Sequence, residues 1–113
     1  MNPDAPAGSG IRRYPRIGVD LSVRVAPQDG RQTFARAHDI SCGGIALYVP
    51  LDLDPEEVIK ISFELPNSRM QFAVSGVIKN RNGFRYGIEF VQLTSDQFRE
   101  LERVLAILAL VRH

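Results

Sequence analysis

Apolar and polar residues alternate along several short stretches of this 113-residue chain, a pattern typical of strands that bury one face. The clearest stretch is 19–25, in which valine and leucine alternate with aspartate, serine and arginine. Six stretches are predicted as strands: 19–25, 32–40, 45–49, 58–65, 70–79 and 84–91. Because no helical pattern separates them, they predict an antiparallel sheet closed into a small barrel.

Turn residues and single side chains add detail to this prediction. Asp29-Gly30 and Asn82-Gly83 are the strongest hairpin signals. Phe34 is expected to be the largest buried anchor of the second strand. Gly76, inside the fifth strand, predicts a bulge or a bend of the barrel wall.

The hydrophobic period changes to that of a helix after the sixth strand, over residues 94–112. Thr94 and Gln97 have the spacing of a capping box. One broad apolar face of this helix is expected to pack on the barrel: Phe98, Leu101, Val104, Leu105, Leu108 and Val111. Ile107 and Leu110 are left on another side, so either the helix end is buried deeply or these two residues bind a partner or another copy of the chain.

Composition indicates a soluble globular domain, with 44% apolar and 24% charged residues. The predicted organisation is a flexible tail over 1–10 and a single domain over 11–113, made of an arginine-rich segment over 11–18, a barrel over 19–92 and the helix. A formal net charge of +1 argues against general attraction to nucleic acid or to anionic membranes.

The cellular compartment of the protein is predicted from the single cysteine and the lack of long apolar runs. Cys42 cannot form a disulfide within the chain, so a secreted disulfide framework is not expected. The longest apolar run, residues 104–111, is far shorter than the about 20 residues that span a bilayer. The N-terminus has no apolar core of a signal peptide. These features predict a cytoplasmic protein without a membrane span.

The candidate chemistry lies in residues 38–44, His-Asp-Ile-Ser-Cys-Gly-Gly, between the second and third predicted strands. Asp39 and Ser41 are two residues apart, so an extended chain would direct both side chains to the same side. Two adjacent glycines, which lack Cβ atoms and tolerate positive φ, would let a ligand approach the backbone. Upstream, Arg12 and Arg16 lie on a segment that Pro15 keeps out of a helix. Together the two stretches suggest a receptor for a ligand that carries both anionic groups and bases.

Arg12-x-x-x-Arg16 followed by Asp39-x-Ser41-x-x-Gly44 resembles the paired signature of the PilZ domain, a bacterial receptor for the second messenger cyclic di-GMP. The resemblance covers nearly the whole chain from Arg12. It implies a six- to seven-stranded antiparallel barrel with a C-terminal helix, no catalysis and no cofactor. It also implies that the bound nucleotide changes contacts with an effector protein. The residues that it assigns to cyclic di-GMP are Arg12, Arg16, Asp39, Ser41 and Gly44, with Arg13 and Gly43 beside them.

The expected roles follow from the hydrogen-bonding groups of the ligand. An arginine fork can bind O6 and N7 of guanine, or phosphate oxygens, with two hydrogen bonds. Asp39 would accept donors from guanine or hold an arginine in place. The alternative is that Asp39 and Ser41 only close a turn while the arginines are solvated.

Catalysis and metal binding receive little support from the sequence. His38, Asp39 and Ser41 have the residue types of a hydrolytic triad, but strand alternation would place His38 and Asp39 on opposite faces. No His or Cys pairs have the spacing of a zinc site. Cys42 is expected to be a small filler of the turn rather than a reactive thiol.

Two rival functions remain. One is an adaptor of the same fold that does not bind the nucleotide and acts through Ile107 and Leu110 of its C-terminal helix. With either function, the protein is expected to be a monomer or a weak homodimer. The other is a binder of single-stranded nucleic acid, which would need aromatic and basic residues interleaved along the strands. The basic residues instead gather near Arg12, so direct nucleic-acid binding is not expected.

Overall fold

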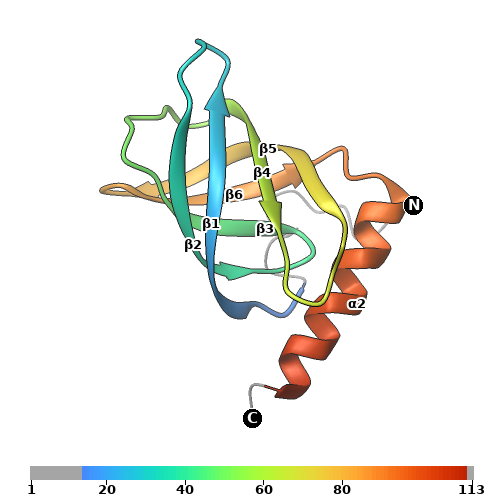
Figure 1. Ribbon diagram of the computed structural model, residues 1–113. Coiled ribbons are helices and arrows are strands. Elements are labelled where there is room, and N and C mark those ends of the chain that lie inside the picture. Colours follow the sequence, from blue (N-terminus) through green and yellow to red (C-terminus); the bar gives the residue numbers. More distant parts are fainter. Residues whose placement is uncertain (1–13, 112–113) are drawn as a thin grey trace, which may run out of the picture.

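The computed structural model describes residues 14–111 and shows a closed antiparallel barrel with one helix beside it (Figure 1). The strands follow each other around the barrel in the order β1-β2-β3-β6-β5-β4. Their bounds are β1 Ile17–Pro27, β2 Thr33–Ile40, β3 Gly44–Tyr48, β4 Val58–Glu64, β5 Gln71–Asn82 and β6 Arg85–Val91, followed by helix α2 over Ser95–Val111. The predicted six-stranded barrel with a C-terminal helix is confirmed.

Both predicted glycine turns are confirmed. Gly30 has a φ of 93° in the β1–β2 connection, and its N–H lies 3.4 Å from the carbonyl oxygen of Pro27. Gly83, with a φ of 64°, follows Asn82, the last residue of β5, which pairs with Arg85. Glycine adopts these left-handed conformations more readily than other residues, which is why the sequence located both turns well.

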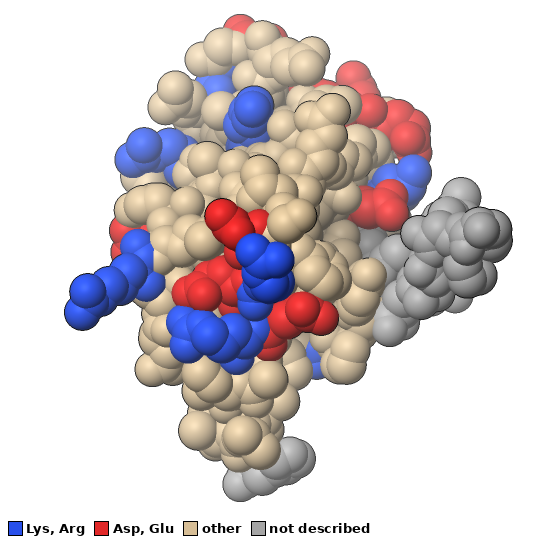
Figure 2. Space-filling model, turned by 90° about the vertical axis from the view of Figure 1, so that its right-hand side faces the viewer, with Lys and Arg blue, Asp and Glu red and all other residues tan. Residues whose placement is uncertain are grey.

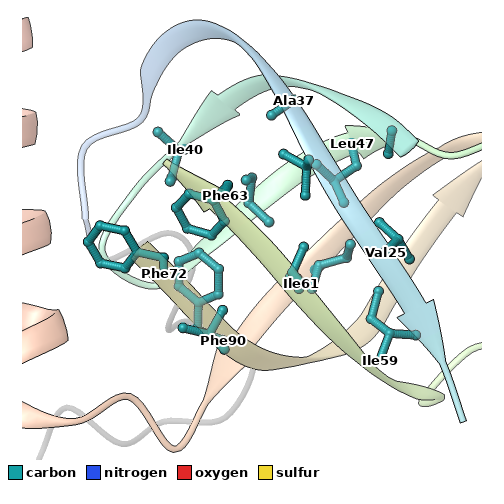
Figure 3. Close-up of a cluster of buried hydrophobic side chains, with 14 of the residues drawn as sticks. Val25, Ala37, Ile40, Leu47, Ile59, Ile61, Phe63, Phe72 and Phe90 are labelled. Atoms are coloured by element: carbon teal, nitrogen blue, oxygen red, sulfur yellow. The ribbon is translucent and has the colours of Figure 1, made fainter. Parts of the chain in front are cut away.

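The barrel interior is filled by aliphatic and aromatic side chains from all six strands. Phe63 and Phe72 stack with ring centroids 5.1 Å apart, and Phe90 lies 6.3 Å from Phe63. Figure 3 shows these three rings at the end of the barrel nearest the helix. The inward residues alternate with outward ones, so one cluster of buried side chains holds the strands in register.

The burial of Phe34 was predicted wrongly, and of the two alternatives for Gly76 the bulge is wrong. Phe34 is 63% exposed, because Ala35 occupies the inward position of β2 and directs its neighbour outward, under the guanidinium of Arg24. Gly76 lies in uninterrupted pairing with β4 and β6 rather than in a bulge. A Cβ there would lie 2.4 Å from Cγ2 of Ile88, so this glycine is required by close packing in the interior.

Helix α2 begins with the predicted capping box. The Thr94 N–H donates to Oε1 of Gln97, and the Gln97 N–H donates to Oγ1 of Thr94, both at 3.0 Å. These bonds satisfy two backbone donors that a helix start leaves free. The side chains of α2 that are buried against the barrel are Leu101, Val104 and Leu105.

The last turn of α2 extends past the barrel (Figure 1). Val111 was predicted to pack on the barrel but is 70% exposed, and Leu110 is 76% exposed. Ile107 is half-buried, so the two residues of the predicted partner site differ in exposure. No helix within residues 14–111 is long and apolar enough to cross a membrane.

Charged side chains gather over the middle of the exposed face of α2 (Figure 2). Arg99 pairs with Asp96 at 2.7 Å, and Arg103 pairs with Glu100 at 2.8 Å. Hydrogen bonds from Arg103 and then Ser68 lower the pKa of Glu100 to about 2. These charges neutralise one another along the helix.

Candidate functional site

The two halves of the sequence motif meet on the outer wall of the barrel. Arg16 directly precedes β1, and Nη1 of Arg16 donates to Oδ1 of Asp39 in β2 at 2.9 Å. The pairing of Gly18 with Asp39 brings the start of β1 beside the end of β2. Both side chains remain accessible, at 44% exposed for Arg16 and 20% for Asp39. Arg12 and Arg13 lie outside the described residues.

Ser41 shapes the turn that joins β2 to β3. Its side chain is 1% exposed, and Oγ accepts hydrogen bonds from the N–H groups of Gly43 at 3.1 Å and Gly44 at 3.2 Å. The Ser41 N–H in turn donates to the carbonyl oxygen of Gly44 at 2.9 Å. The hydroxyl therefore faces back into the turn, whereas Asp39 is bound to Arg16.

The two glycines of this turn are not used for left-handed backbone. Within residues 14–111 the glycines with positive φ are Gly30 and Gly83. Gly43 instead accepts, through its carbonyl oxygen, the Phe90 N–H at 2.9 Å, and Gly44 starts β3 as a buried residue. The turn thus presses directly against β6.

His38 lies on the same side as Asp39, contrary to the prediction from strand alternation. The pairing of β2 with β3 shifts between Ala37 and Asp39, so His38 is the extra residue of a bulge. Nδ1 of His38 lies 3.4 Å from Oδ2 of Asp39. Residues i and i+1 face one way here because the bulge interrupts the alternation. No catalytic triad follows, since the Ser41 hydroxyl is buried in its own turn.

Arg85 joins this group from β6. Its Nε donates to Nε2 of His38 at 2.9 Å, and the His38 ring lies 5.1 Å from the ring of Tyr48. Contacts therefore run from Arg16 through Asp39 and His38 to Arg85. Arg85 lies 47 residues from His38 along the chain, so no local sequence signal links the two residues.

A hollow of about 180 Å³ lies beside these residues; we call it the barrel-wall hollow. Its floor holds the paired residues Ala46 and Gly87, which carry one methyl group between them. A Cβ at Gly87 would lie 2.5 Å from Oδ1 of Asn80. The residues that line the hollow are Arg16, Ala46, Asn80, Asn82, Arg85, Tyr86 and Gly87. Two guanidinium groups and two amides thus line the hollow together with Tyr86 and the small residues Ala46 and Gly87.

A second, apolar hollow of about 260 Å³ lies between the start of β1 and α2; we call it the barrel-end cavity. It is lined by Tyr14, Pro15, Ile17, Cys42, Glu102, Leu105, Ala106 and Ala109. Burial raises the pKa of Cys42 to about 11, and the charge of Glu102 acts in the same direction. This thiol is therefore protonated at neutral pH and weakly nucleophilic. Within residues 14–111 no cluster of three side chains suits a metal ion.

The family model of the PilZ domain matches residues 11–106 of the chain. The chain belongs to the PilZ domain family. Among relatives, it is 31% identical over 98 residues to the flagellar brake protein YcgR of Thioalkalivibrio sulfidiphilus. The match covers 80% of this chain and 39% of the relative, so the chain spans about two fifths of that protein's length.

Solved structures confirm the PilZ-type barrel. The K. pneumonia MrkH–c-di-GMP complex matches with a TM-score of 0.77 and 23% identity, over 89% of this chain and 53% of that one. The PilZ domain of YcgR from Escherichia coli, solved with c-di-GMP, matches with a TM-score of 0.69 and 19% identity, over 87% and 91%. Bacillus subtilis MotI, described as an inhibitor of motility, matches with a TM-score of 0.74 and 18% identity, over 90% and 53%.

Proposed function

We propose that this PilZ domain is a receptor for cyclic di-GMP, which binds on the barrel wall where Arg16 meets Asp39. The observation that carries the proposal is the 2.9 Å contact between these two motif residues, which are 23 positions apart in sequence. Two solved PilZ relatives hold the same nucleotide. The chain carries the arginine and the aspartate-serine-glycine motifs in full.

Arg16 binds the nucleotide through the guanidinium nitrogens that Asp39 does not occupy. Asp39 accepts one hydrogen bond, from Nη1, and so fixes the orientation of the fork while leaving other N–H groups for guanine or phosphate acceptors. Arg12 supplies the second fork of the motif and Arg13 an additional positive charge. A pair of forks on one ligand suits the two phosphates and two guanines of cyclic di-GMP.

Ser41 contributes through the turn rather than through direct contact. Its hydroxyl oxygen holds the N–H groups of Gly43 and Gly44, which keeps the turn small and leaves room for the ligand above it. The turn also contacts β6 through the carbonyl oxygen of Gly43. The nucleotide is thus bound by arginines whose positions depend on a rigid turn.

The bound nucleotide signals through contact with an effector protein, without catalysis, cofactor or direct contact with nucleic acid. A second candidate function is an adaptor that acts through α2 without a nucleotide. The exposure of Leu110 and Val111 at the end of α2 favours that candidate, and Ile107 would belong to the same surface. The two functions differ in whether the barrel wall binds the nucleotide.

Calorimetric titration of cyclic di-GMP distinguishes the receptor from the adaptor. Arg16→Ala should weaken binding about ten- to a hundredfold, the effect of losing a charged hydrogen-bonding group. Arg31→Ala is the matched control, because Arg31 lies in the β1–β2 connection and pairs with Asp29. That variant should bind like the unaltered protein. Absence of binding heat for the unaltered chain, or equal affinities for all three proteins, would contradict the proposed function.

A further inference from the structure

We propose that Arg85 is a further nucleotide-binding residue and that His38 is the positioning residue that holds its guanidinium beside the barrel-wall hollow. The inference rests on the proposed cyclic di-GMP site. It adds to that site two residues that lie outside both sequence motifs, one from the bulge of β2 and one from β6.

His38 makes two polar contacts, one through each ring nitrogen. Nε2 accepts a hydrogen bond from Nε of Arg85 at 2.9 Å, so Nε2 carries no proton. The proton of the neutral ring is then on Nδ1, which lies 3.4 Å from Oδ2 of Asp39. One imidazole thereby links the arginine of β6 to the aspartate of the motif.

The bulge in β2 makes this link possible. Regular alternation would direct His38 away from Asp39, to the other face of the strand. The extra residue leaves both His38 and Asp39 on the outer wall, where the imidazole also contacts Tyr48 with ring centroids 5.1 Å apart. The ring is therefore restrained by side chains from β2, β3 and β6. Bulges often direct a side chain toward a binding site.

Arg85 keeps most of its donors for a ligand. Among the hydrogen bonds within residues 14–111, the Arg85 side chain donates from Nε to His38. Both Nη nitrogens, with two N–H groups each, remain. Arg85 lines the same hollow as Arg16, so two guanidinium groups border one small surface. The remaining Nη pair suits two neighbouring acceptor atoms of the nucleotide, either O6 and N7 of guanine or two phosphate oxygens.

The residues around Arg85 and His38 do not neutralise the charge of Arg85. Asp39, the acidic group beside His38, is already bound by Arg16. The other nearby polar residues of the hollow are the neutral amides Asn80 and Asn82. The hollow therefore keeps an excess of positive charge, which favours an anionic ligand over a neutral one.

The test is the dissociation constant of cyclic di-GMP, measured by calorimetry on the full chain. Arg85→Ala should weaken binding about tenfold. His38→Ala should weaken it about three- to tenfold, and the double variant should bind no more weakly than Arg85→Ala alone. Such non-additivity shows that His38 acts through Arg85. Arg36→Ala, which removes a neighbouring arginine paired with Asp20, should leave affinity unchanged.

Two conservative variants separate positioning from a merely structural role. In His38→Gln the amide oxygen reaches about as far as Nε2 and can accept from Arg85. In His38→Asn the shorter amide reaches only the place of Nδ1, near Asp39. Binding should be largely restored by glutamine and not by asparagine, while thermal melting shows that both variants fold.

The outcomes distinguish this inference from the proposed function. If the unaltered protein does not bind cyclic di-GMP, the proposed function fails and the inference with it. If Arg16→Ala weakens binding but Arg85→Ala does not, the nucleotide site stands and the role of Arg85 is overturned. If asparagine rather than glutamine restores binding, His38 acts on Asp39 alone and its proposed link to Arg85 is wrong.

Discussion

Residues 14–17 border two hollows of opposite character. Arg16 lines the barrel-wall hollow, which is bounded by guanidinium and amide groups. Its neighbours Tyr14, Pro15 and Ile17 line the barrel-end cavity, which is largely apolar. Pro15 and Ile17, on either side of Arg16, face away from it, as successive side chains of an extended chain do. One short segment therefore contributes to a polar site and to an apolar cavity at the same time.

Because the two hollows differ in polarity, the residues around them should contribute differently to nucleotide affinity and to folding stability. Arg16 and Asp39 form an accessible ion pair, and such pairs contribute little to folding stability. The barrel-end cavity is bordered by Leu105 and by Cys42, both buried, and burial of apolar side chains dominates stability. Changes at the barrel wall should therefore alter nucleotide affinity, whereas changes at the barrel end should alter unfolding.

The largest expected effect is on stability, from shortening the leucines of α2. Leu101 is fully buried and Leu105 borders the barrel-end cavity. Leu101→Ala should cost about 3–5 kcal/mol of unfolding free energy, and Leu105→Ala about 2–3 kcal/mol, because part of its surroundings is already empty. Urea denaturation measures both. Equal costs would show that the cavity does not reduce the contacts of Leu105.

Cys42 carries the thiol that lines the barrel-end cavity. Because burial raises the pKa of Cys42 from 9.0 to about 11, the folded protein should react with iodoacetamide about 100-fold more slowly at pH 8 than the unfolded chain. The measurement is the alkylation rate by mass spectrometry, with and without urea. Equal rates in both states would mean that the cavity exposes the thiol.

The same shift predicts a pH dependence of stability. The folded state keeps the proton that the unfolded thiol loses near pH 9.0. The contribution of Cys42 to stability is therefore fully present below about pH 9 and is lost as the pH rises toward 11. Cys42→Ala lacks this group. The amount by which the unfolding free energy of the unaltered protein exceeds that of Cys42→Ala should therefore decrease as the pH rises from about 9 to 11.

Much of the fold could be predicted from the sequence, because its signals are local. The capping box of Thr94 and Gln97 and the turn at Gly83 depend on neighbouring residues, and both form as expected. The prediction for Phe34 failed for a physical reason. Whether a residue of a strand faces inward depends on the register with partners that are distant in sequence.

The candidate site could be predicted only in part. Arg16 and Asp39 were found by their motif spacing, and the structure places them in contact. His38 and Asp39 were expected on opposite faces and lie on the same one, because a bulge changes the alternation without a distinct sequence signal. Arg85 and the glycine floor at Gly87 become neighbours of the motif only through the closure of the barrel.

A smaller effect should come from filling the barrel-wall hollow. A Cβ at Gly87 would lie 2.5–2.9 Å from the side-chain atoms of Asn80, which can rotate away into the hollow. Gly87→Ala should therefore weaken cyclic di-GMP binding about tenfold if the ligand lies on this floor, with little change in melting temperature. The matched change Gly76→Ala meets Ile88 and the backbone of Glu89 and should lower stability instead.

The smallest expected effect comes from filling the barrel-end cavity. Ala109 lines it, and its volume of about 260 Å³ leaves space for a larger aliphatic side chain. Ala109→Leu should raise the free energy of unfolding by about 0.5–1 kcal/mol through added apolar burial. Leu110→Ala, which shortens an exposed side chain of the same helix turn, should change stability by less than about 0.5 kcal/mol. Cyclic di-GMP affinity should stay constant in both variants. A change in affinity with Ala109→Leu would show that residues 14–17 couple the two hollows, because Arg16 would then respond to the packing of Tyr14 and Ile17.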